Sequence, residues 1–204
     1  MSEVALFVKV CGITRLEDLR AVAEAGADAI GLVIGFPSSP RNLSLEAARR
    51  IAREARGGPF SIAVLEGSDP KLVEDVCSAV EPYGLQVYGP ADPDSLRSLG
   101  VRFLIRPVAP EARELPEGFD AVLLDRSHGK GLPIDLEVAA EFVRRSSLPV
   151  ILSGGLNPYN VAEVVRRVRP FGVDASSGLE SAQGVKDSAK VRAFVERARR
   201  AHEG

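Results

Sequence analysis

The sequence of 204 residues contains no tryptophan, one methionine and two cysteines, and its acidic and basic residues nearly balance. The net charge of −2 gives no electrostatic reason to expect binding to nucleic acid or to an anionic membrane. Cys11 and Cys77 have no spacing that suggests a disulfide framework or a metal site. We therefore expect no metal, no nucleic-acid partner and no membrane partner.

No apolar run approaches the roughly 20 residues that a membrane-spanning helix needs. The first ten residues lack a basic leader followed by a long apolar stretch, so we expect a cytoplasmic protein. Apolar residues make up 45% of the chain and charged residues 26%, which is typical of a soluble globular protein. The length allows one sizeable core, and we expect a single domain over residues 1–204.

Eight short apolar runs alternate with longer helical patterns along the whole chain. The runs are Phe7–Val10, Ala29–Ile34, Ser61–Leu65, Leu85–Tyr88, Phe103–Val108, Ala121–Leu124, Pro149–Leu152 and Gly172–Ala175. Nearly continuous apolar strands separated by helices indicate a parallel sheet that is covered on its outer face. Eight such units without a linker predict an α/β fold, a single (βα)8 TIM barrel, with an open doubly wound sheet as the alternative.

Capping residues and turn residues support this count of units. Thr14 and Glu17 fit a capping box at the start of the first helix, and Gly26 stands where that helix should end. A capping side chain precedes a proline at three other predicted helix starts, which are Asp69-Pro70, Asp92-Pro93 and Asn157-Pro158. The prolines that follow Phe103 leave room only for a short or irregular crossover in the fifth unit.

Two glycine-rich segments stand where the last two strands end, which is where a barrel carries its active-site loops. Glycines let backbone N–H groups approach an anion, and the loops after the seventh and eighth strands are the usual phosphate site of a barrel. Tight left-handed turns without a ligand are the alternative. We predict phosphate binding by Ser153, Gly154, Gly155, Ser177 and Gly178.

Cys11 ends the first strand, and strand alternation places it on the same face as Lys9. If Val8 and Val10 face the helices, then Lys9 and Cys11 face the interior of the barrel together. A nearby ammonium would lower the pKa of the thiol from its usual value of about 8.5 and favour the thiolate. A small buried thiol without a function is the alternative interpretation, and the residues alone leave both open.

Three further charged residues stand at or near strand ends. Asp125 follows the sixth strand and Asp174 lies in the eighth, where a carboxylate is unfavourable unless it is paired or used. A catalytic role is one interpretation of each, and a helix cap or an ion pair with a loop residue is the other. Arg41 follows the second strand and has the geometry to bind a carboxylate through two parallel hydrogen bonds, unless it is a surface residue.

Taken in order, these segments resemble the phosphoribosylanthranilate isomerase family. The matching segments are Lys9-Val-Cys-Gly-Ile-Thr14, Gly26-Ala-Asp-Ala29, Ser39-Pro-Arg41, Leu123-Leu-Asp125, Leu152-Ser-Gly-Gly-Leu-Asn-Pro158, Asp174 through Gly178, and Gly184-Val-Lys-Asp187. The resemblance implies a (βα)8 barrel without a cofactor or a metal. It also implies the Amadori rearrangement of N-(5-phosphoribosyl)anthranilate, a phosphorylated amino-sugar, in tryptophan biosynthesis.

The resemblance further implies roles for single residues. Asp125 is expected to be the general acid and Cys11, as a thiolate, the general base. Arg41 is expected to hold the carboxylate of the anthranilate. The other expected substrate-binding residues are Lys9, Gln86 and Asp174, and a homodimer is left open.

The chain departs from the family pattern at three places. Tyr88 stands where the family usually has a histidine, and Glu66-Gly67 ends a strand that usually ends Phe-Val-Asn. The loop at 126–131 is shorter than the usual glycine-rich loop. Two alternatives therefore stay open, which are another barrel enzyme acting on a phosphorylated sugar and a barrel that binds a phosphorylated ligand without catalysis. The first includes indole-glycerol-phosphate synthases and histidine-pathway isomerases.

Overall fold

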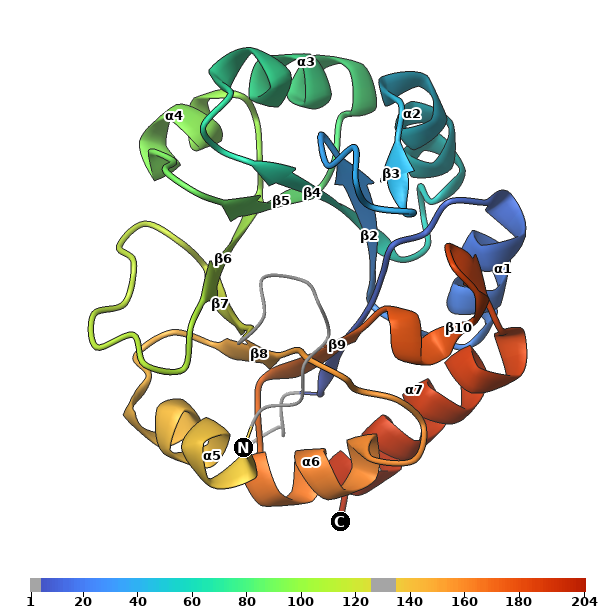
Figure 1. Cartoon of the computed structure of the whole chain (residues 1–204), viewed down its shortest axis with the longest axis vertical. Helices are drawn as coiled ribbons and strands as arrows, with labels where there is room; N and C mark the ends of the chain where they lie inside the picture. Colours follow the sequence, from blue (N-terminus) through green and yellow to red (C-terminus); the bar gives the residue numbers. More distant parts are fainter. Residues whose placement is uncertain (1–4, 126–134) are drawn as a thin grey trace.

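The computed structural model describes residues 5–125 and 135–204, so the loop at 126–131 lies outside the described residues. Within these ranges, eight parallel strands pair in chain order, and β1 pairs with both β2 and β9 to close a barrel (Figure 1). The strands are β1 (Phe7–Cys11), β2 (Ala29–Ile34), β4 (Phe60–Glu66), β5 (Gly84–Tyr88), β6 (Phe103–Val108), β7 (Ala121–Leu124), β8 (Val150–Leu152) and β9 (Gly172–Ala175). All eight predicted strands and the barrel are confirmed, and the open sheet is excluded.

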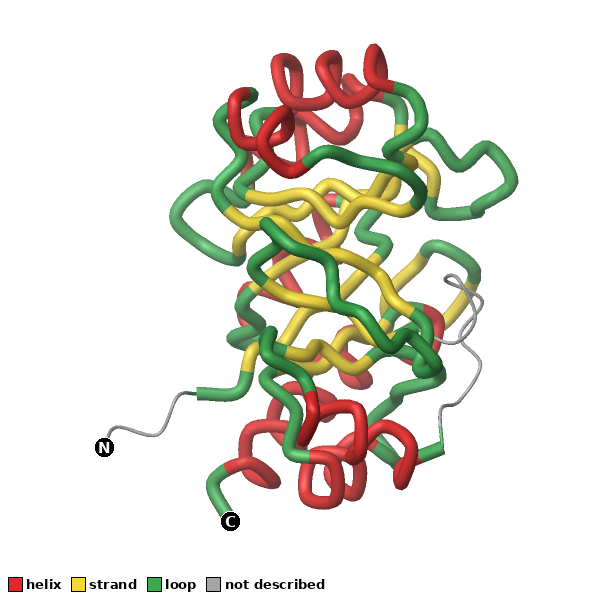
Figure 2. The backbone as a smooth tube through the Cα atoms, turned by 90° about the vertical axis from the view of Figure 1, so that its left-hand side faces the viewer, coloured by secondary structure: helices red, strands yellow, loops and turns green. Residues whose placement is uncertain are grey.

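The helices form a ring outside the barrel, and Figure 2 shows the strands between them from the side. They are α1 (Leu16–Glu24), α2 (Leu45–Glu54), α3 (Pro70–Val80), α4 (Pro93–Ser98), α5 (Leu136–Arg145), α6 (Val161–Val168) and α7 (Ser188–His202). Residues 109–120, between β6 and β7, contain no helix, which confirms the irregular crossover expected there.

Three short elements add to the barrel framework. A two-residue strand β3 (Asn42–Leu43) pairs with the end of β2. After β9, a short 3-10 helix (Ser177–Leu179) leads into an antiparallel hairpin of β10 (Glu180–Ala182) and β11 (Val185–Lys186). This hairpin was not predicted from the sequence. Side chains of the hairpin lie close to the candidate site.

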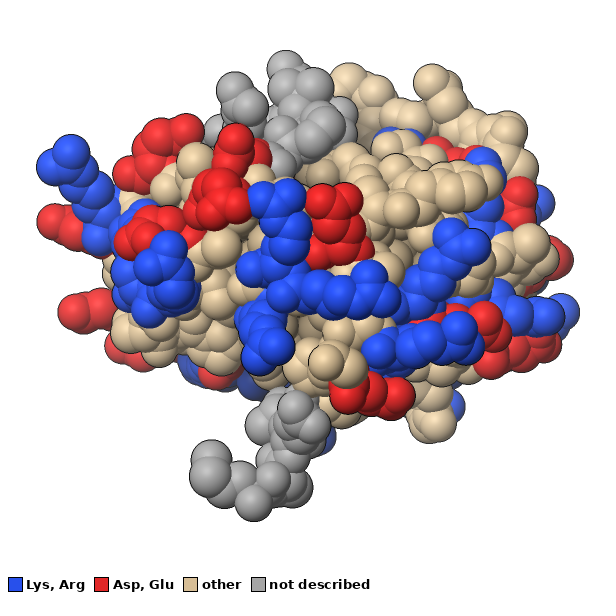
Figure 3. Space-filling model, turned by 90° about the horizontal axis from the view of Figure 1, so that it is seen from below, with Lys and Arg blue, Asp and Glu red and all other residues tan. Residues whose placement is uncertain are grey.

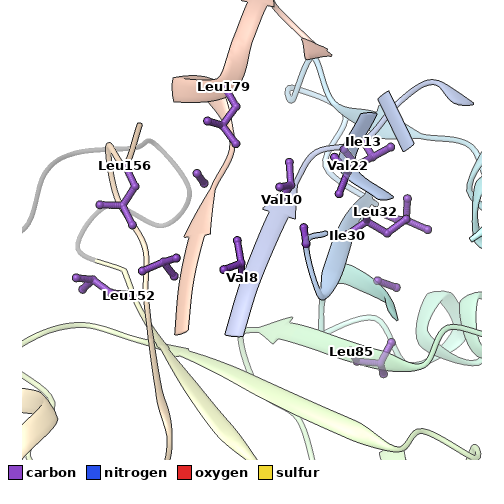
Figure 4. Packing of buried hydrophobic residues seen from close by; sticks show 14 of the residues in the cluster. Val8, Val10, Ile13, Val22, Ile30, Leu32, Leu85, Leu152, Leu156 and Leu179 are labelled. Carbon is purple, nitrogen blue, oxygen red and sulfur yellow. The ribbon is translucent and has the colours of Figure 1, made fainter. Parts of the chain in front are cut away.

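Side-chain alternation along the strands separates two apolar layers. Residues that point outward, such as Val8 and Val10, pack with the inner faces of the helices in the main core. Figure 4 shows this layer around β1 and β2. Each large apolar side chain buried there contributes roughly 1.5–3 kcal/mol. Residues that point inward fill the barrel toward the amino ends of the strands, and they are Ala29, Ile62, Ile105, Ala121, Leu123 and Ile151.

Most of the predicted helix ends are confirmed. Asp69 and Asp92 each accept a hydrogen bond from a backbone N–H in the first turn, and a proline follows each of them. Gly26 follows the end of α1 with a φ of 77°, a conformation that favours glycine. At the start of α2, the Ser44 side chain accepts a hydrogen bond from the N–H of Ala47.

Two predicted caps are wrong because each side chain makes another hydrogen bond in place of the cap. α1 begins at Leu16, and the Thr14 hydroxyl instead donates to the carbonyl of Gly184, 2.6 Å away in the β10–β11 turn. α6 begins only at Val161, because the Asn157 carboxamide oxygen accepts from the N–H of Tyr159 in a local turn. The segment after β8 therefore does not lead directly into a helix.

Charges of both signs share the molecular surface. On the face that includes α6 and α7, lysine and arginine side chains lie among aspartate and glutamate side chains (Figure 3). Among the described residues, no helix is long and apolar enough to cross a membrane. The single domain over residues 1–204, the cytoplasmic location and the absence of a nucleic-acid or membrane partner stay predictions.

Candidate active site

A cavity of about 680 Å³ opens at the carboxyl ends of the barrel strands. This is the end at which (βα)8 barrels carry their active sites. Ten of the eleven predicted site residues line it, and they are Cys11, Arg41, Gln86, Asp125, Ser153, Gly154, Gly155, Asp174, Ser177 and Gly178. The eleventh, Lys9, is fully buried.

Lys9 and Asp174 form an ion pair inside the barrel. The two residues are register partners on β1 and β9, and the Lys9 Nζ lies 3.0 Å from the Asp174 Oδ1. Burial works to lower the pKa of Lys9, but the charges of Asp174 and Cys11 raise it above its usual value. Lys9 is therefore a cation at neutral pH, and Asp174 pairs with this lysine of the neighbouring strand rather than with the basic loop residue weighed from the sequence.

Cys11 is the next inward-facing residue of β1 after Lys9. The absence of a side chain at a neighbouring glycine leaves room for its sulfur. The register partner of Cys11 on β2 is Gly31, where an added Cβ would lie 2.6 Å from the Cys11 Sγ. Any larger residue at position 31 would displace the sulfur. The prediction that Lys9 and Cys11 share the barrel interior is confirmed.

The predicted direction of the Cys11 pKa is wrong. Burial raises the pKa of the thiol, and the carboxylate of Asp174 raises it further. Lys9 and Lys186 act in the opposite direction, but their combined effect is smaller. Burial is the largest effect, and the carboxylate of Asp174 offsets part of the effect of the ammonium, so the pKa lies above its ordinary value.

Asp125 follows β7 and is buried in the same cavity. The Tyr88 hydroxyl donates to the Asp125 Oδ2 at 3.4 Å, and the Gln86 Nε2 donates to the Tyr88 oxygen at 3.3 Å. Burial and the charge of Asp125 raise the pKa of the Tyr88 phenol, which therefore keeps its proton. The buried Gln86 Oε1 has no partner among the described residues, which leaves an acceptor for a bound hydroxyl or amine.

The loop after β8 has the backbone of an anion site. Gly154 and Gly155 have φ values of 104° and 65°, and no described residue accepts a hydrogen bond from their N–H groups. The side-chain amides of Asn157 and Asn160 both donate to the carbonyl of Gly155, which holds the loop in shape. Because α6 begins only at Val161, the anion would be bound by these N–H groups more than by the helix dipole.

The loop after β9 lies against the loop after β8. A Cβ added at Gly178 would collide with the carbonyl of Leu156, so only glycine allows this approach. The Lys186 Nζ, on β11 of the hairpin, donates to the carbonyl of Ser176 at 3.1 Å and so stabilises the loop after β9. The two predicted phosphate segments therefore form one continuous lining of the cavity.

Arg41 binds a carboxylate through two parallel hydrogen bonds. This carboxylate is a side chain of the protein and not the substrate carboxylate that was expected. The Arg41 Nε and Nη2 donate to the Glu180 Oε1 and Oε2, both at 2.7 Å. The guanidinium lines the cavity and is partly buried, so the surface alternative for Arg41 is excluded.

Sequence reasoning missed Glu180 and Lys186 and left Tyr88 without a role. The sequence signal for Lys186 was the matching segment Gly184–Asp187, to which no chemistry was attached, and no matching segment included Glu180. Among the described residues, no group of three or more His, Cys, Asp or Glu side chains could hold a metal.

Comparisons with known proteins agree with this geometry. The family described as N-(5'phosphoribosyl)anthranilate (PRA) isomerase matches residues 8–197. A curated N-(5'-phosphoribosyl)anthranilate isomerase from Methanocella arvoryzae is 38% identical, over 94% of this chain and 97% of its own length.

Two solved structures are also similar to this chain. A phosphoribosyl anthranilate isomerase in complex with reduced 1-(o-carboxyphenylamino)-1-deoxyribulose 5-phosphate has a TM-score of 0.78 and 34% identity, covering 95% of this chain and 98% of its own. A monomeric form of the dimeric enzyme from Thermotoga maritima has a TM-score of 0.78 and 33% identity, with the same coverage.

The family match spans more than nine-tenths of the chain. The Methanocella arvoryzae relative is similar over nearly the full length of both chains, at an identity that is typical of members of one family. The closed barrel and the cavity at its carboxyl end are those expected of that family. The chain belongs to the N-(5'-phosphoribosyl)anthranilate isomerase family and is an isomerase of tryptophan biosynthesis.

Proposed function

We propose that this chain converts N-(5-phosphoribosyl)anthranilate to 1-(2-carboxyphenylamino)-1-deoxyribulose 5-phosphate with Asp125 as general acid and Cys11 as general base. The observation that carries the proposal is a single cavity lined by a thiol, a carboxylate, an arginine and two glycine-rich loops. The substrate offers a matching set of groups, which are a carbon acid, a ring oxygen, an aromatic carboxylate and a phosphate.

The reaction has two stages that need opposite proton transfers. Asp125 donates a proton to the ring oxygen, the bond from C1 to that oxygen breaks, and the nitrogen lone pair forms a C1–N double bond. Cys11 then removes the proton from C2, the electron pair of that C–H bond forms a C1–C2 double bond, and the π pair of the C1–N double bond returns to nitrogen. Tautomerisation of this enolamine places a ketone at C2 and a proton at C1. Positioned proton transfers of this kind each contribute roughly 10²–10⁴-fold.

The rest of the cavity binds the substrate in this proposal. Gly154, Gly155, Ser177 and Gly178 offer backbone donors to the phosphate, with Ser153 beside them. Arg41 holds the aromatic carboxylate. The remaining polar groups of the cavity, Gln86 and Asp174, face the sugar hydroxyls and the amine, and the buried Lys9 holds Asp174 in place. The unpartnered Gln86 oxygen supports this.

Replacing Asp125 with asparagine removes the acid and keeps its size. We expect kcat for Asp125→Asn to fall at least about 100-fold with little change in substrate affinity. The assay follows the loss of anthranilate-type fluorescence, which no tryptophan obscures. Asp75→Asn, an exposed aspartate of α3, controls for loss of one negative charge. Activity of Asp125→Asn within a few-fold of the parent would make Asp125 structural.

Cys11→Ser tests the base, because a serine hydroxyl stays protonated where a thiol does not. We expect kcat to fall at least about 100-fold. In the parent, kcat/KM should rise with pH, because the base works only without its proton. Since burial raises the pKa of Cys11, the midpoint of this rise should lie above the ordinary 9.0.

Cys77→Ala is the matched control for the thiol. Cys77 lies in α3, away from the site cavity, and burial raises its pKa to about 11. Its replacement should change neither turnover nor the pH profile, and iodoacetamide should inactivate the parent through Cys11, with protection by product. Near-parental kcat in Cys11→Ser, or inactivation that tracks Cys77, would contradict the assignment.

Gly155→Val tests the phosphate loop. A side chain at a φ of 65° strains the backbone and blocks close approach of an anion, so binding of inorganic phosphate and product should weaken. Gly26→Val is the control, because it has a similar φ of 77° and open space around it. Calorimetry on both variants separates the two effects. Parental phosphate affinity in a folded Gly155→Val protein would refute the phosphate assignment.

We also propose that the chain forms a homodimer through the amino end of the barrel. A second hollow, of about 670 Å³, lies there and includes Phe60 and Leu99, two of the large apolar side chains that stay exposed. Phe60 is 46% exposed and stacks on Tyr83 with ring centroids 4.1 Å apart. An exposed apolar rim around a hollow is typical of a protein–protein contact, and a dimeric relative supports this occupant.

Phe60→Glu should convert a dimer into a monomer, because a buried unpaired carboxylate disfavours the interface. Val138→Glu is the matched control, since Val138 is also 46% exposed but lies on α5. Light scattering measures the mass of each protein. A monomeric parent, or a dimer that survives Phe60→Glu, would contradict this interface.

A further inference from the structure

Glu180 has no place in the catalytic scheme, yet it pairs with two basic side chains, one of which, Arg41, lines the cavity. Both of its oxygens bind the guanidinium of Arg41 at 2.7 Å. Its Oε1 also accepts from the Lys186 Nζ at 2.9 Å, and the Lys186 side chain is fully buried. A buried carboxylate is tolerated only when it is paired in this way. The cluster therefore pairs one carboxylate with two basic groups, and burial lowers the pKa of the second of them, Lys186.

The ion pair with Glu180 uses one edge of the Arg41 guanidinium, and the donors of the other edge stay available. An arginine has five N–H donors in a planar fork. Glu180 takes the edge formed by Nε and Nη2. No described residue accepts from Nη1, and Arg41 lines the cavity. The edge formed by Nη1 and the second Nη2 hydrogen therefore remains for a second carboxylate.

The stem of Arg41 is fixed as well as its head. A Cβ added at Gly12 would collide with the Arg41 Cδ, so the side chain passes directly over the backbone beside Cys11. The Arg41 N–H is also held by the Ser39 hydroxyl at 3.2 Å. With the stem on Gly12 and the head on Glu180, the guanidinium has one position, close to the base.

We propose that Glu180 is a positioning residue that fixes the Arg41 guanidinium with its outer edge open to the aromatic carboxylate of the substrate. Lys186 supports Glu180 and links it to the carbonyl of Ser176 in the second phosphate loop. The subsites for carboxylate and phosphate, at opposite ends of the substrate, are thereby braced by one hairpin. This inference rests on the proposed function, because it names the substrate group that Arg41 receives.

The ionisation of the cluster agrees with this geometry. Burial acts to raise the pKa of Glu180, but Arg41 and Lys186 lower it further than burial raises it. The hydrogen bonds to Glu180 raise the pKa of Arg41. Glu180 is therefore an anion at neutral pH and does not release Arg41.

The test compares Glu180→Gln with the parent on two substrates, N-(5-phosphoribosyl)anthranilate and the carboxyl-free N-(5-phosphoribosyl)aniline. Glutamine keeps the size of the side chain but cannot bind both guanidinium donors. With the anthranilate substrate, KM should rise about 10-fold while kcat stays within about 3-fold. With the aniline substrate, both constants should match the parent, which also shows that the variant is folded.

Two further variants complete the design. Arg41→Met should lose the preference for the carboxylate substrate, and adding Glu180→Gln to it should cause no further loss, because the two act through one contact. Glu163→Gln, in an exposed ion pair with Arg167 on α6, is the control for loss of a negative charge.

Three results would overturn the inference. Equal effects of Glu180→Gln on both substrates would indicate a merely structural carboxylate. A lower KM for the anthranilate substrate would mean that Glu180 competes with the substrate for Arg41. A parent that does not turn over the anthranilate substrate would instead refute the proposed function, and the carboxylate subsite with it.

Discussion

The ion pair between Lys9 and Asp174 is the constraint to which the other charges of the site adjust. A fully buried ammonium is strongly unfavourable without a partner, and the parallel register of β1 and β9 supplies one at the same level of the barrel. These are the first and last strands of the barrel, so the polar layer lies where the sheet closes. Below it the interior is apolar and filled, and above it the cavity opens.

This ion pair explains why the pKa of the neighbouring Cys11 thiol is not lowered by Lys9 as a single lysine would lower it. A lysine alone would stabilise the thiolate of Cys11, but the adjacent Asp174 opposes that effect, and burial, the largest effect, decides the direction of the pKa. A raised pKa leaves little thiolate at neutral pH, but the thiolate that forms is a stronger base. For the removal of a proton from carbon proposed for Cys11, the arrangement favours the strength of the base over its abundance.

The parts of the fold and site that depend on local pattern could be predicted from the sequence. Apolar runs gave the strands, and Asp-Pro pairs gave two helix starts, because both arise from interactions within a few residues. Alternation along β1 placed Lys9 and Cys11 inward. The convergence of the site residues followed from one rule of barrels, that the carboxyl ends of all strands meet at one face.

The hydrogen-bond and ion-pair partners of the polar side chains could not be predicted from the sequence. These partners lie on segments far apart in the chain, and a local sequence pattern contains no information about them. Thr14 bonds to a carbonyl 170 residues away, and Arg41 to a carboxylate 139 residues away. In a buried ion pair such as Lys9–Asp174, replacing one member leaves the other unpaired, at a cost of about 3–5 kcal/mol. Loss of activity on changing Lys9 or Asp174 singly would therefore combine lost chemistry with lost stability. Only paired changes, or a substrate that lacks the recognised group, separate the two.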